Sequence, residues 1–78
     1  MIMEYIELNP KILAGKPLIK GTRISVEQII ATLALGTSID EILLEYDGLQ
    51  KEEILACLRY AERLLEKTST FDLDKFAS

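Results

Sequence analysis

The sequence predicts a mainly α-helical domain, in which short β-strands precede three helices and the last two helices form a helix-turn-helix. Apolar residues recur at helical spacing over three stretches after residue 25. Helix start and stop signals bound these stretches. Before residue 25, short apolar runs alternate with turn signals, which is typical of strands and turns. We therefore interpret residues 1–67 as one domain, with residues 1–25 as its β segment, and residues 68–78 as a C-terminal tail.

The β segment opens with a predicted strand over residues 1–8, because Tyr5, Ile6 and Leu8 favour extended structure. The Asn9-Pro10 pair then ends this strand, and residues 11–15 are expected to form a turn. Residues 22–26 favour extended structure again. The segment is therefore expected to hold two or three very short strands.

The first helix is predicted to begin after Ser25, which forms an S-x-x-Q capping box with Gln28. Gly36 is expected to end this helix in a left-handed conformation. The apolar face between these signals comprises Val26, Ile29, Ile30 and Leu33.

The second helix is predicted to begin after Ser38, which forms another capping box with Glu41. Asp47-Gly48 is expected to end the helix in a tight turn, with Leu49 pointing back to the core. The predicted apolar face comprises Ile39, Ile42, Leu43 and Tyr46.

The third helix is predicted over residues 51–67, after Gln50, which is a weak N-cap. Glu52 and Glu53 suit its first turn, where the helix dipole favours negative charge. Its apolar stripe comprises Ile54, Cys57, Leu58, Ala61, Leu64 and Leu65. On this stripe Cys57 is expected to be a core residue, since no neighbouring base would lower the pKa of its thiol.

Composition argues against catalysis. The chain has no histidine and one cysteine, so neither a zinc site of nitrogen and sulfur ligands nor a His-based catalytic pair can form within it. We expect no enzyme activity, no catalytic residue, no metal and no cofactor. A single cysteine, no signal peptide and apolar runs too short to cross a bilayer predict a cytoplasmic protein that does not contact membranes.

The helix-turn-helix pattern makes DNA a candidate partner, although the net charge is −4. In a homeodomain-like arrangement, the start of the third helix would meet base edges through Lys51, Glu52, Leu55 and Arg59. Residues 1–25 hold four basic and two acidic residues, whereas residues 26–50 hold five acidic residues and no basic one. The basic side chains Lys16, Lys20 and Arg23 are therefore further candidates for phosphate contact.

The residues assigned to DNA binding can also have purely structural roles. Three-helix bundles without a nucleic-acid role share the same pattern. Arg23 can instead pair with an acidic residue of the second or third helix, and Glu52 and Glu53 can simply cap the third helix in solvent.

Three stretches of the chain resemble a known family. The stretches G-K-P-L-I-K-G-T-R-I-S-V-E, S-I-D-E-I-L-L-E-Y and L-Q-K-E-E-I-L-A-C-L-R-Y-A are similar to the domain of unknown function 433 family, over residues 6–65. Gln50 departs from the Thr or Ser that this family usually carries there. The resemblance implies a homeodomain-like fold and a relation to antitoxins of VapB type, which neutralise a PIN-like ribonuclease toxin and can bind operator DNA.

The tail fits such a role, because Phe71, Leu73 and Phe76 alternate with acidic residues that would mimic RNA phosphates in a ribonuclease groove. The alternative for the tail is a frayed terminus. The expected function is thus an antitoxin of a type II toxin–antitoxin pair, and a homodimer is expected. The alternative function is a dimeric protein-interaction module that does not bind DNA.

Overall fold

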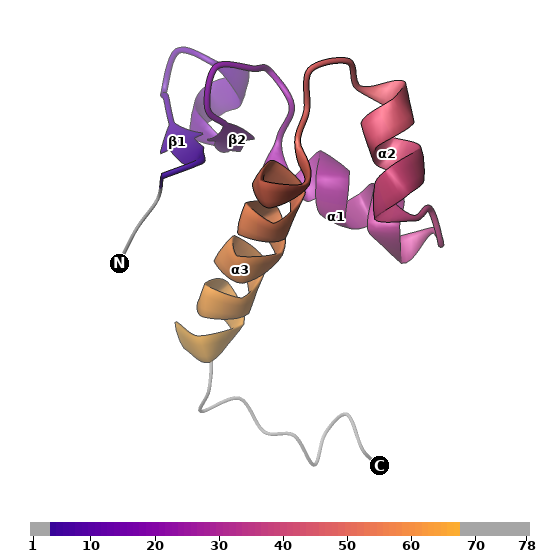
Figure 1. Cartoon of the computed structure of the whole chain (residues 1–78). Helices are drawn as coiled ribbons and strands as arrows, with labels where there is room; N and C mark the ends of the chain where they lie inside the picture. The colour runs from indigo at the N-terminus through magenta and orange to yellow at the C-terminus, as the bar shows by residue number, and fades with distance from the viewer. Residues whose placement is uncertain (1–3, 68–78) are drawn as a thin grey trace, which may run out of the picture.

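The computed structural model describes residues 4–67 and confirms the mainly helical class, with a small antiparallel sheet ahead of three helices (Figure 1). The elements in chain order are β1 (Ile6–Leu8), the 3₁₀ turn η1 (Leu13–Gly15), β2 (Pro17–Ile19), α1 (Val26–Ala34), α2 (Ile39–Glu45) and α3 (Lys51–Lys67). The first strand begins at Ile6 and is therefore shorter than the predicted span.

The two strands form a hairpin in which Ile6 lies opposite Ile19. An isolated antiparallel bridge joins Leu18 to Ser25. Ser25 lies within residues 22–26, the third stretch for which the sequence predicts extended structure. Within the turn between the strands, Leu13 and Ala14 adopt left-handed conformations, with φ of 49° and 57°. Non-glycine residues rarely adopt this region of backbone space, and no sequence signal pointed to it here.

Local hydrogen bonds cap both ends of helix α1. The Ser25 hydroxyl accepts a bond from the Gln28 amide at 2.9 Å, as the predicted cap requires. The Gln28 side chain does not complete the capping box among residues 4–67; instead it donates to the Tyr46 hydroxyl at 2.7 Å. At the other end Gly36 has φ of +98°, and its amide and that of Thr37 bond back to carbonyls of the last turn. These two hydrogen bonds together form a Schellman cap.

Helix α2 begins with the complete capping box that the sequence predicts. The Glu41 amide donates to the Ser38 hydroxyl at 3.1 Å, and the Ser38 amide donates to the Glu41 carboxylate at 2.8 Å. The helix ends at Glu45, so residues 46–50 connect it to α3. Gly48, with φ of +90°, provides the corner of this connection.

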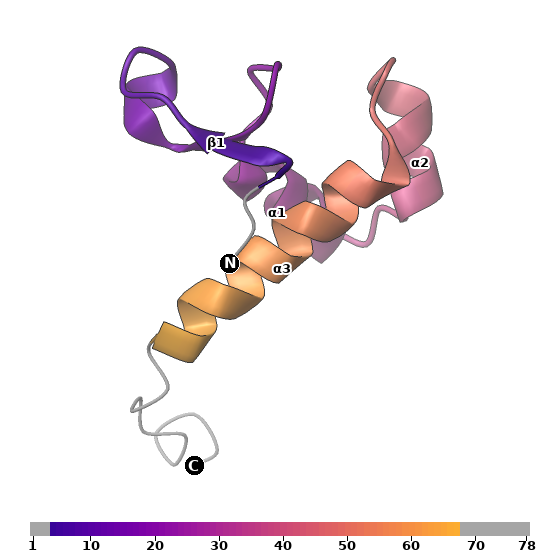
Figure 2. The same ribbon diagram turned by 60° about the vertical axis from the view of Figure 1, so that its left-hand side comes forward.

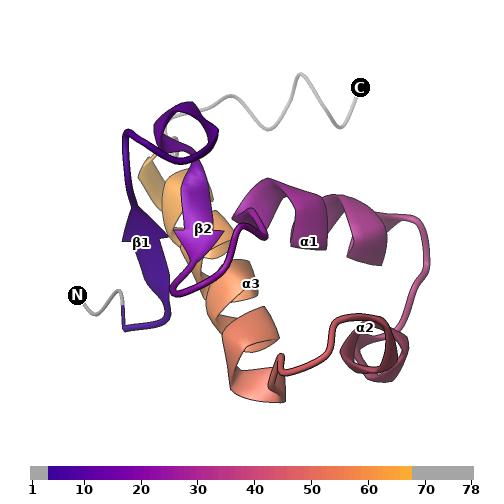
Figure 3. The same ribbon diagram turned by 90° about the horizontal axis from the view of Figure 1, so that it is seen from above.

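One hydrophobic core joins the hairpin to the helices. Figure 3 shows α3 passing beneath the hairpin, with α1 and α2 on its other side. The fully buried large side chains come from β2 and all three helices: Leu18, Ile19, Ile29, Ile42, Ile54 and Cys57. The C-terminal half of α3 projects beyond the other elements (Figure 2). The core thus covers only the first part of the longest helix.

Candidate functional site

The outward face at the start of α3 holds the DNA-binding candidates of this helix. Lys51 and Arg59 are exposed and Leu55 is half-buried, and their spacing of four residues places all three on one side. The opposite side of the helix is buried, since Ile54 and Cys57 are 0% exposed. The structure therefore presents the predicted recognition face to solvent.

The connection between α2 and α3 differs slightly from the prediction. The connection spans residues 46–50 and is one residue longer than expected, because α2 ends at Glu45. The Leu49 amide bonds to the Tyr46 carbonyl at 3.2 Å, and Leu49 packs against the core as predicted.

Acidic residues are frequent in α2, in the connection to α3 and at the start of α3, and their charge opposes the approach of phosphates to this region. The exposed acidic residues of α2, the corner and the start of α3 are Asp40, Glu41, Glu45, Asp47 and Glu52. The half-buried Glu53 accepts a hydrogen bond from the Gln50 amide at 2.8 Å, so one of the two glutamates caps α3. The exposed Arg63 continues the same four-residue spacing beyond Arg59, so α3 offers few cations on this face to neutralise phosphates.

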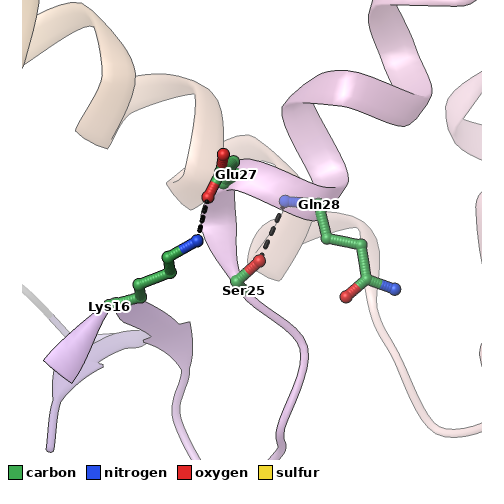
Figure 4. Close-up of polar contacts among 4 residues, drawn as sticks. All are labelled: Lys16, Ser25, Glu27 and Gln28. Atoms are coloured by element: carbon green, nitrogen blue, oxygen red, sulfur yellow. Dashed lines mark hydrogen bonds and ion pairs between the residues drawn. The ribbon is translucent and has the colours of Figure 1, made fainter. Parts of the chain in front are cut away.

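The basic residues of the N-terminal segment differ in their surroundings. Lys16 forms an ion pair with Glu27 of α1, with 2.9 Å between the ammonium nitrogen and a carboxylate oxygen (Figure 4). Lys20 and Arg23 are exposed in the loop between β2 and α1. Within residues 4–67 Arg23 forms no ion pair, so the predicted alternative of pairing with an acidic residue of α2 or α3 is wrong there.

An open apolar groove lies between α1 and α3, and the sequence did not predict it. Its volume is about 390 Å³, and Pro17 lies at its margin. The helices line it with Ile30 and Ala31 from α1 and Tyr60, Ala61 and Leu64 from α3. The signal that could have found it is the apolar stripe of α3, which continues past the core: Leu58 is 39%, Leu64 50% and Leu65 71% exposed.

Cys57 is a core residue, as predicted, and is 0% exposed. Burial raises the pKa of its thiol from 9.0 to about 11, and the negative charge of Glu53 adds to the increase. The thiolate required for nucleophilic chemistry is therefore disfavoured at neutral pH. Among residues 4–67, no three side chains of His, Cys, Asp or Glu type lie close enough together to hold a metal ion.

Two further expectations concern the ends of the domain and its relation to membranes. The predicted toxin-binding residues Phe71, Leu73 and Phe76 lie outside the described residues. In the part of the chain that the structure describes, no helix has both the length and the apolar character needed to cross a bilayer.

Comparison with known proteins identifies the family. Residues 6–61 match the family described as "Protein of unknown function (DUF433)". The chain is similar to the uncharacterized protein y4eO of Sinorhizobium fredii, with 36% identity over 59 residues, which are 76% of this chain and 27% of that protein. It thus spans about a quarter of that relative.

The fold is also similar to the crystal structure of a DUF433 member protein from Anabaena variabilis, with a TM-score of 0.77 and 29% identity. The match covers 87% of this chain and 67% of that one. Because the family match covers most of the domain from β1 into α3, the chain belongs to the DUF433 family.

Proposed function

We propose that this protein is a non-catalytic antitoxin that binds and neutralises a PIN-like ribonuclease. The family resemblance of the sequence suggests the partner. The structural observation that carries the proposal is the open apolar groove between α1 and α3, since exposed contiguous apolar surface is typical of protein-binding sites.

The chemistry of the groove supports a protein partner over a polar ligand. Ile30, Tyr60 and Leu64 provide apolar and aromatic contact area, which dominates the energetics of protein interfaces. The one charged residue among the lining, Glu27, is already paired with Lys16 at the surface. A partner that places apolar side chains here gains burial without having to desolvate an unpaired charge.

Inhibition of a PIN-like ribonuclease by this protein tests the proposal, using a matched pair of leucines. Leu64 lines the groove and is 50% exposed, whereas Leu44 of α2 is 87% exposed and lies outside the groove. We expect Leu64→Glu to weaken inhibition at least about tenfold, which corresponds to about 1.4 kcal/mol of binding energy. Leu44→Glu should inhibit like the wild type. The proposal fails if the wild type does not inhibit at equimolar dose, or if both variants inhibit equally.

A second candidate function is operator binding through α3. It is favoured by the shared exposed face of Lys51, Leu55 and Arg59. Retention of a fragment of its own promoter should then fall as salt is raised, but with a shallow slope, because the slope scales with the number of phosphates neutralised and few cations carry these contacts. Lys51→Ala and Arg59→Ala should each reduce retention, while the exposed loop variant Lys11→Ala should not. The absence of salt-dependent retention at any protein concentration would instead favour a protein-interaction module that does not bind DNA.

A further inference from the structure

The apolar groove lies close to the point where α3 leaves the described structure. Leu64, which lines the groove, precedes the last residue of the helix, Lys67, by three residues. At about 1.5 Å per residue, the distance along the axis from Lys67 back to Tyr60 is about 10 Å. The chain that follows Lys67 therefore starts beside one end of the groove.

Residues 68–78 carry three large apolar side chains, Phe71, Leu73 and Phe76. Phe71 is the fourth residue after Lys67, and an extended chain advances about 3.3 Å per residue, so Phe71 can lie up to about 13 Å from Lys67. That reach exceeds the distance from Lys67 back to Tyr60 along the helix. The segment can therefore turn back and place Phe71 over the groove without disturbing α3.

The size and chemistry of the groove suit this segment. An apolar cavity of about 150 Å³ holds one benzene ring, so the open volume of about 390 Å³ accommodates about two aromatic rings. Phe71 and Leu73 are two residues apart, so both can enter this volume from one side of an extended segment. Asp72 and Asp74 alternate with the apolar residues, so an extended backbone directs these carboxylates away from Phe71 and Leu73.

We propose that in the free protein residues 68–78 fold back and fill the groove of their own chain with Phe71 and its apolar neighbours. A covalently attached segment acts at an effective concentration in the millimolar range, which favours it over the groove-binding surface of a second copy. The inference goes beyond the proposed function, because it concerns the protein without a partner. A partner that takes the groove must displace this segment, and displacement presents Phe71, Leu73 and Phe76 to that partner.

Tryptophan fluorescence of the full chain tests the fold-back. The chain has no tryptophan, so Phe71→Trp introduces a single probe. A matched pair of α1 alanines provides the comparison: both are exposed, but Ala31 lines the groove and Ala34 is absent from its lining. We expect the probe to be shielded from acrylamide in the parent and in the Ala34→Arg background. Ala31→Arg should fill the groove and raise the quenching constant several-fold. Circular dichroism checks that both backgrounds keep their helices.

Three outcomes would overturn the proposal. The first is full quenching of the probe in the parent. The second is shielding that persists in the Ala31→Arg background, which would place the segment elsewhere. The third is shielding that grows with protein concentration, which would assign the groove to a second copy. None of these measurements involves a ribonuclease or DNA, so their failure is separate from failure of the proposed function.

Discussion

Four isoleucines tie the elements of the domain together. Each is 0% exposed, and β2, α1, α2 and α3 contribute one apiece: Ile19, Ile29, Ile42 and Ile54. Because interiors are close-packed, removing atoms from one of these side chains leaves a void that its neighbours fill only in part. These few positions should therefore contribute a large share of the folding stability.

A pair of residues in α2 measures this contrast. Ile42 is 0% exposed and Leu44 is 87% exposed. We expect Ile42→Ala to lower the free energy of unfolding by about 2–5 kcal/mol, and Leu44→Ala to change it by less than about 0.5 kcal/mol. Urea denaturation followed by circular dichroism gives both values. If Ile42→Ala does not fold, Ile42→Val should still fold and lose about 0.5–1.5 kcal/mol. Equal losses at the two positions would contradict the burial described above.

Cys57 makes stability dependent on alkaline pH. Burial raises the pKa of its thiol from 9.0 to about 11, so the unfolded chain releases this proton at lower pH than the folded chain. Its contribution to stability is complete below pH 9 and falls as pH rises toward 11, by about 1.4 kcal/mol per pH unit.

Comparing the wild type with Cys57→Ala isolates the contribution of this thiol. Urea denaturation at several pH values should show the difference in unfolding free energy between the two proteins shrinking across that window. A difference that is constant with pH would show that the thiol has an ordinary pKa.

Short-range sequence signals set the boundaries of the helices, so the sequence predicts these boundaries well. The capping box of Ser38 and Glu41 forms as expected, and the left-handed Gly36 ends α1 where predicted. The Gln28 side chain departs from its expected cap because the Tyr46 hydroxyl, eighteen residues away in sequence, offers a competing bond. Sequence-local reasoning has no access to such a partner.

The cap of α2 gives a test at the scale of one helix. Ser38→Ala removes the acceptor of the Glu41 amide and should lower the free energy of unfolding by about 1 kcal/mol. Ser38→Asn retains an acceptor at this position and should cost less than half as much. Chemical denaturation of both variants measures the effect. Equal losses would mean that the side-chain oxygen does not cap the helix.

The candidate site could be predicted only in part, because the sequence does not show how far the shorter helix α1 covers the longer helix α3. The spacing of Lys51, Leu55 and Arg59 predicts that they share one side of α3, where Lys51 and Arg59 are exposed and Leu55 is half-buried. The groove could not be predicted, because helical spacing identifies an apolar stripe but not the length of the elements that cover it. Here α3 has 17 residues and α1 has 9, so part of the stripe of α3 stays uncovered.

The charge of the whole molecule is uneven, and this uneven distribution sets its response to salt. Residues 26–50 hold five acidic residues and no basic one. Among residues 4–67 the Lys16–Glu27 contact is the one ion pair, and it is exposed, so salt has little attraction to screen. Repulsion among the acidic side chains should therefore dominate the electrostatic contribution to stability.

Raising NaCl from about 0.1 M to about 1 M shortens the Debye length from about 10 Å to about 3 Å. The urea midpoint of the wild type should rise over this range, because the repulsion is screened. Glu45→Gln removes one exposed acidic charge and should reduce the rise. A midpoint that falls with salt would show that attractive pairs outweigh the repulsion.

Ser25 belongs to two structures at once. Its backbone forms the bridge to Leu18 beside the hairpin, and its hydroxyl caps the first turn of α1. Separating the bridge withdraws the cap, and unwinding the first turn frees the residue that holds the bridge. The hairpin and α1 are thus coupled as a single cooperative unit, so their amide protons should exchange with solvent through a shared opening event.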